Sequence, residues 1–63
     1  MTQKELLYVE DAYGHEKNII SILEDTINNL KDENLISFIE KEIKKHKTMQ
    51  EKLMNLLEGK ENE

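Results

Sequence analysis

The chain has 63 residues, a formal net charge of −5 at pH 7, and neither cysteine nor proline. A chain of this length forms one small domain with a core that is marginal for a monomer, and without cysteine it lacks disulfides and thiolate metal sites. The negative charge argues against nucleic acid and anionic membranes as main partners, because both bind basic surfaces. No apolar run approaches the ~20 residues of a membrane span, and no signal-peptide pattern is present, so we expect a cytoplasmic location.

A first amphipathic helix is expected at about residues 3–31. Thr2 and Glu5 have the spacing of a capping box, in which each side chain accepts a hydrogen bond from the other residue's backbone amide. Apolar residues then recur every three or four positions, which is the period of one helix face. This first stripe consists of Leu6, Val9, Tyr13, Ile20, Leu23, Ile27 and Leu30.

A second helix is expected at about residues 34–58. A polar break at 31–34 separates the two stripes, and Asp32 or Asn34 is suited to cap the second helix. Gly59 is well placed as the residue just past the helix end, and we expect residues 59–63 to form a flexible tail. The second stripe consists of Ile36, Ile39, Ile43, Leu53 and Leu57.

The short connection between the two stripes predicts an all-α antiparallel hairpin over residues 1–58. A hairpin gives each helix one partner, and each stripe is too broad for one partner to cover. Further apolar residues flank the stripes, namely Ala12, Ile19 and Ile22 in the first half and Leu35, Met49 and Leu56 in the second. We therefore expect two hairpins to form a homodimer, which is a four-helix bundle.

Glu16 and His46 interrupt the two apolar stripes near the middle of each predicted helix. Counted from the turn, their heights differ by only ~5 Å at ~1.5 Å per residue, so the two side chains should meet. A Glu and a His in a helical core are costly unless they are paired. One interpretation is a buried hydrogen bond between them, with Gln50 of the second stripe as a further partner, that fixes register and oligomeric state.

A metal site is the second interpretation of this polar layer. A dimer would bring together two copies each of Glu16, Glu42 and His46, a set suited to Fe, Mn or Zn. Di-iron bundles use a Glu-x-x-His motif, whereas Glu42 and His46 are spaced i,i+4 here. Glu10 and His15 are weaker candidates at the flanks of the first stripe. No cofactor is required by the first interpretation.

Catalytic motifs do not accompany the polar layer. The chain has no nucleophile elbow, phosphate loop or His-Glu-x-x-His motif, and Ser21 and Ser37 have no His beside them on the same helix face. We therefore expect a non-enzymatic structural or interaction module. Phe38 lies outside the second apolar stripe and is a candidate contact for a protein partner. A small adaptor that docks on such a partner is the third interpretation.

Several of these features together resemble the Coat F domain of spore-forming Firmicutes, a short ferritin-like helical hairpin. The matching residues are Glu5, the Glu16-Lys17 pair, Asn34 and His46, within a resemblance that spans about residues 4–57. The chain lacks the Gly-Trp-Tyr ending that family members often carry. The resemblance implies a ferritin-like four-helix bundle with a structural role and a location in the spore coat.

Overall fold

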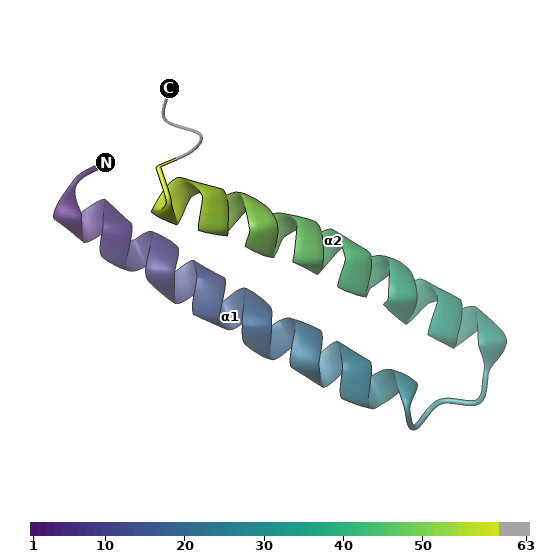
Figure 1. The fold of residues 1–63 in the computed structure, drawn as a ribbon. Helices are drawn as coiled ribbons and strands as arrows, with labels where there is room; N and C mark the ends of the chain where they lie inside the picture. The colour runs from purple at the N-terminus through teal and green to yellow at the C-terminus, as the bar shows by residue number, and fades with distance from the viewer. Residues whose placement is uncertain (60–63) are drawn as a thin grey trace.

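The computed structural model describes residues 1–59 and consists of two helices that pack side by side (Figure 1). Helix α1 spans Gln3–Ile27, helix α2 spans Glu33–Leu57, and each contains 25 residues. The helices run antiparallel, so the start of α1 and the end of α2 lie together at one end, which we call the open end (Figure 1). The predicted all-α hairpin is confirmed, and its dimerisation stays a prediction.

The predicted capping box begins α1. The backbone amide of Glu5 donates to Oγ1 of Thr2 at 3.1 Å, and the backbone amide of Thr2 donates to Oε1 of Glu5 at 2.7 Å. The hydrogen bond from the Thr2 backbone favours the ionised carboxylate and is the main reason that the pKa of Glu5 lies below its usual value of 4.5. Two amides that the helix leaves without partners are satisfied in this way.

Asp32, rather than Asn34, caps α2. Its Oδ1 accepts hydrogen bonds from the amides of Asn34 at 2.8 Å and Leu35 at 3.0 Å. At the other end of α2, Gly59 has a φ of 76°, a left-handed conformation that glycine adopts without steric cost. Asp32 therefore supplies the hydrogen-bond acceptor that the start of α2 needs, and Gly59 supplies the left-handed backbone that follows its end.

Helix α1 ends at Ile27, earlier than the expected end at residue 31. The amides of Asn29 and Leu30 donate to carbonyls three residues back, at 3.0 and 3.1 Å, which closes a turn in place of a further helical turn. The Asn29 side chain also donates to the carbonyl of Asp25 at 3.0 Å, a contact that competes with helix continuation. The expected tail beyond Gly59 lies outside the described residues.

A single hairpin buries very little. Ile20, with 7% of its surface exposed, is the only buried residue among residues 1–59. The chain exposes 5122 Å², whereas a folded monomer of 7.5 kDa exposes about 4,200 Å². The other stripe residues except Leu6 are half-buried: Val9, Tyr13, Leu23, Ile27, Leu30, Ile36, Ile39, Ile43, Leu53 and Leu57.

Most of the exposed apolar side chains gather on one broad side of the hairpin. Successive residues of a helix turn by 100°, which places the flanking residues of both helices on the same side of the seam. We call this side the apolar face, and its exposed members are Tyr8, Ile19, Ile22, Leu35, Phe38 and Met49. The opposite side, which we call the charged face, carries Ser21, Glu24, Ser37, Glu40, Lys44 and Lys47. An ion pair between Lys47 and Glu24, with Nζ and Oε2 3.5 Å apart, crosses the charged face.

Candidate functional site

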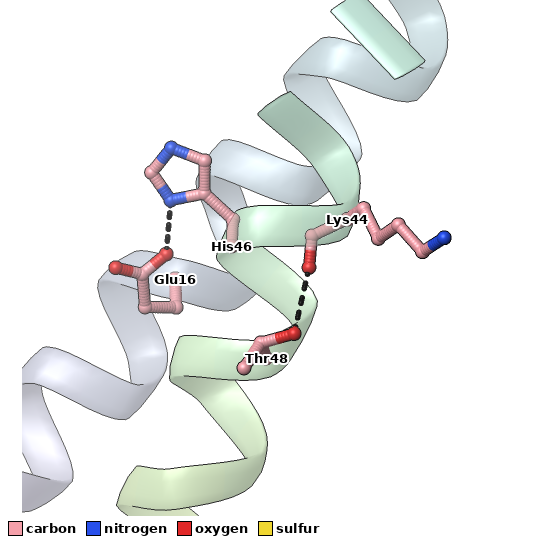
Figure 2. Close-up of polar contacts among 4 residues, drawn as sticks. All are labelled: Glu16, Lys44, His46 and Thr48. Atoms are coloured by element: carbon pink, nitrogen blue, oxygen red, sulfur yellow. Dashed lines mark hydrogen bonds and ion pairs between the residues drawn. The ribbon is translucent and has the colours of Figure 1, made fainter. Parts of the chain in front are cut away.

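Glu16 and His46 meet across the seam between the two helices. Nδ1 of His46 lies 2.5 Å from Oε2 of Glu16 (Figure 2). Each residue lies close to the middle of its helix, and each occupies a position of the apolar stripe. The contact that the sequence predicted between these two side chains is confirmed.

Both side chains of the pair are half-buried. The Glu16 side chain is 16% exposed and the His46 side chain 30% exposed. A carboxylate only accepts hydrogen bonds, so Nδ1 of His46 is the donor and Oε2 of Glu16 the acceptor. Nε2 lies on the far side of the imidazole ring from Glu16, and Lys44 extends from the other side of α2 (Figure 2).

This contact specifies the register of α1 against α2. If α2 slid by one turn against α1, the Glu16–His46 hydrogen bond would be lost, and His46 would lie at the level of Ile20 or Tyr13 instead. A buried polar group that loses its partner costs about 1–3 kcal/mol, and more when it is charged. The pair therefore favours one alignment of the helices over alignments that would bury similar apolar area.

Glu42, the third predicted metal ligand, has a different partner in a single chain. It is half-buried, and its Oε2 lies 3.2 Å from Nζ of Lys45. Within residues 1–59 of one chain, no group of three His, Asp or Glu side chains is arranged to hold a metal ion. The predicted set of Glu16, Glu42 and His46 thus needs a second copy of the chain to reach the ligand number of a metal centre.

Glu10 and His15, the weaker metal candidates, lie outside the seam. Both are exposed, and both line a shallow hollow on the outer side of α1 that Gly14 also lines. A Cβ added at Gly14 would meet no atom within 4 Å, so this glycine does not mark a close approach to α2. Neither Glu10 nor His15 joins the Glu16–His46 pair.

A hollow of about 440 Å³ at the open end of the hairpin is not evident from the sequence. Its lining comes from both helices, because the antiparallel register brings the first turns of α1 beside the last turns of α2. The hollow could have been located from two features of the sequence. The Glu16–His46 contact sets which turns of the helices lie side by side, and the turn of 100° per residue sets which side chains share a side. The lining residues are Met1, Glu5, Tyr8, Val9 and Leu56.

Comparisons with known proteins identify no relative of the chain. No family model matches it, and neither does a curated protein or a solved structure. Of the described helices, neither has the length and apolar character that crossing a membrane requires. The resemblance to the Coat F domain therefore rests on the quoted residues alone and stays a prediction.

Proposed function

We propose that the chain is a small non-enzymatic structural module that acts as a homodimeric, ferritin-like four-helix bundle. The resemblance to the Coat F domain supports a role in the spore coat or in its assembly. The Glu16–His46 pair serves this role as the polar layer that fixes how the four helices align. The dimer supplies the core that a single hairpin lacks.

The exposed apolar face is the observation that carries this proposal. The chain exposes 5122 Å², roughly 900 Å² more than a compact monomer of its mass. Each partner in a standard protein interface buries about 800 Å². Phe38 and Ile22 alone are 59% and 63% exposed, and burying each contributes about 1.5–3 kcal/mol. A second copy that covers this face would bury these side chains.

Two neighbouring residues of α2 provide a matched test by sedimentation equilibrium. Phe38 belongs to the apolar face and Ser37 to the charged face, and both are exposed in the single chain. Phe38→Lys should weaken dimerisation at least tenfold, whereas Ser37→Lys should leave it unchanged. Equal effects of the two variants, or a monomeric parent protein, would contradict the proposal. A partly molten monomer would instead favour an adaptor that docks on another protein through Phe38.

A metal-binding bundle is the second candidate function, and the orientation of His46 favours it. Histidines that bind metals commonly donate one ring N–H to a carboxylate and bind the ion through the other nitrogen. His46 donates from Nδ1 to Glu16, which leaves Nε2 as the atom for a metal. In a dimer, two His46 and two Glu42 would supply the ligands, and Glu16 would orient the imidazole. Fe, Mn or Zn suits such a donor set.

Metal content separates the two candidates. The dialysed protein is loaded with Zn²⁺, Mn²⁺ or Fe²⁺, washed, and analysed by elemental mass spectrometry. The metal-binding function predicts stoichiometric uptake that His46→Gln abolishes and that Lys44→Gln, on the charged face, leaves unchanged. The absence of uptake by the parent dimer, or equal uptake by both variants, would contradict a site at His46.

A further inference from the structure

We propose that copies of the chain associate edge to edge, with the outer side of α2 of one copy against the outer side of α1 of the next. The contact goes beyond the proposed homodimer, because it uses the two edges of the hairpin and leaves the apolar face free. Repeated from copy to copy, it forms a ribbon of hairpins that all point the same way. The opposite charges of the two edges and the match of their levels lead to this inference.

The outer side of α2 is basic. Lys41, Lys45, Thr48 and Lys52 each follow a position of the second stripe by two residues, which turns them by about 200° from the seam. All four are exposed, and we call them the basic edge. Lys45 contacts Glu42, whereas Lys41 and Lys52 make no ion pair within residues 1–59. The basic edge therefore has two lysines whose charge is not balanced in a single chain.

The outer side of α1 carries the opposite charge. Asp11, Asn18 and Asp25 recur every seven residues, and each follows a position of the first stripe by two, so they lie opposite the seam. With Gly14 they form what we call the acidic edge. All three side chains are exposed, and neither aspartate makes an ion pair in the part of the chain that the structure describes. Each edge thus carries unpaired charges of one sign.

A hollow of about 420 Å³ lies on the acidic edge around Gly14. Its charged lining consists of the carboxylates of Glu10 and Asp11 and the amine of Lys17. A Cβ at Gly14 would meet no atom within 4 Å, so the packing of α1 against α2 does not require this glycine. Glycine leaves the backbone open to close approach from outside, which a helix of a neighbouring copy can use.

The two edges match in level at the hollow and toward the open end. Gly14 and Thr48 each lie two positions, or ~3 Å, from the level of the Glu16–His46 pair. Asp11 and Lys52 lie ~7.5 and ~9 Å from that level in the same direction. Two hairpins that lie side by side without axial offset therefore place small residue against small residue and carboxylate against amine.

The match continues toward the turn. Lys41 lies ~7.5 Å and Asp25 ~13.5 Å from the level of the central pair, both on the turn side. The difference of ~6 Å is about one helical turn, and the flexible four-carbon stem of lysine can span it. One edge contact thus joins two pairs of opposite charges, one on each side of the hollow.

The signs of the charges favour a head-to-tail contact over a two-fold one. A two-fold contact places the same surface on both copies, so it would set lysine edge on lysine edge or aspartate edge on aspartate edge. Like charges that face each other across an interface are unfavourable. A head-to-tail contact pairs opposite charges and leaves one edge free at each end, so further copies can add.

The strength of the contact sets the conditions of the test. Exposed ion pairs stabilise weakly one by one, and salt screens them. The ribbon should therefore form in concentrated protein at low ionic strength, whereas both edges are free in dilute protein. Small-angle X-ray scattering over a series of protein and salt concentrations measures the average mass under both conditions.

At ~0.01 M ionic strength, where the Debye length is about 30 Å, the average mass should rise with protein concentration. At ~1 M, where this length is about 3 Å, the mass should fall at least twofold. It should fall to that of a dimer if the homodimer holds, and to that of one chain if only the edges associate. The proposed function and this inference therefore fail separately. A mass at low salt that is independent of protein concentration would overturn the ribbon.

Charge reversal at one matched level tests the contact itself. Lys52→Glu and Asp11→Lys each place like charges at that level, and each should weaken the low-salt association at least fivefold. The double variant Lys52→Glu/Asp11→Lys keeps the net charge of the parent and should recover the association. Lys31→Glu, in the turn, is the control for net charge and should have no effect. Equal losses in Lys31→Glu and Lys52→Glu, or no recovery in the double variant, would overturn the contact.

Cross-linking identifies the partners directly. A carbodiimide couples a lysine amine to a carboxylate that touches it, and Lys52 and Asp11 lie on opposite edges of one hairpin. A Lys52–Asp11 cross-link in a mixture of labelled and unlabelled chains should therefore join one chain of each kind. The Lys47–Glu24 pair, with Nζ and Oε2 3.5 Å apart in one chain, is the positive control. Cross-linking of the control pair alone in concentrated protein would contradict the edge contact.

Discussion

Nδ1 of His46 lies 2.5 Å from Oε2 of Glu16, although the two residues are 30 positions apart in the chain. This contact joins the midpoints of two 25-residue helices and lies in a seam that is otherwise lined mainly by apolar side chains. It therefore specifies the register of the hairpin, while the surrounding apolar residues supply the driving force for packing.

A double-mutant cycle measures what the Glu16–His46 pair contributes. Replacing one partner by Leu leaves the other unpaired, and His46→Leu should be the more destabilising change because it leaves a carboxylate in the apolar seam. The double variant Glu16→Leu/His46→Leu should be as stable as the parent or more stable, since good apolar packing often replaces a buried pair without loss. Chemical unfolding should give a coupling energy of roughly 1–3 kcal/mol.

The exposed ion pair on the charged face is the control for this cycle. Lys47 and Glu24 also join the two helices, but both side chains are exposed. Lys47→Ala should change the free energy of unfolding by less than about 1 kcal/mol. A coupling energy near zero for Glu16 and His46, equal to that of the exposed pair, would show that their bond does not select the register.

Gly14→Ala should stabilise the protein by about 1 kcal/mol. Glycine in a helix interior is less favourable than alanine by this amount, and a Cβ at position 14 meets no atom within 4 Å. Thermal and urea unfolding of the variant measure the change. A loss of stability would mean that another chain contacts Gly14, which would place an interface on the outer side of α1.

Asp32→Ala should destabilise the hairpin by about 1 kcal/mol, within the 0.5–2 kcal/mol range of helix caps. The substitution removes the acceptor of the Asn34 and Leu35 amides at the start of α2. Asp32→Asn is the matched control, because asparagine keeps an oxygen that can accept these bonds. Amide hydrogen exchange should accelerate in the first turn of α2 in the alanine variant alone.

The capping box should make the first turn of α1 sensitive to acid. The pKa of Glu5 is lowered by its hydrogen bonds with Thr2, so its stabilising contribution is fully present above the ordinary value of 4.5. That contribution is lost as the pH falls through the lower pKa of the folded state. Glu5→Gln should remove this part of the pH dependence. NMR titration of the Glu5 carboxyl carbon checks the direction, and a value at or above 4.5 would contradict it.

Much of the hairpin could be predicted from local chemistry. Three signals that each act over a few residues set helix boundaries. They are the Thr2–Glu5 box at the start of α1, the break at 31–34 before α2, and Gly59 after the end of α2. The meeting of Glu16 and His46 also followed from the sequence, because helix rise converts sequence position into height. The end of α1 was placed too late, since the apolar period continues to Leu30 while the backbone already turns after Ile27.

The shape of the surface could be predicted less well from the sequence. The hollow beside Tyr8 and Leu56 depends on which turns of two antiparallel helices lie together, and a one-turn change of register would move it. The Lys45 contact of Glu42 depends on side-chain conformation, which helical spacing does not determine. Stripes and caps are therefore encoded locally, whereas the hollow emerges only from the packed hairpin.

A native mass spectrum of the untagged protein, purified without chelator, tests the homodimer most directly. We expect a species of twice 7.5 kDa that dissociates when Phe38 is changed to Lys and persists when Ser37 is changed to Lys. The same spectrum reports bound metal ions as added mass. A cooperatively folded monomer at 7.5 kDa, with the apolar face uncovered, would contradict the dimeric bundle.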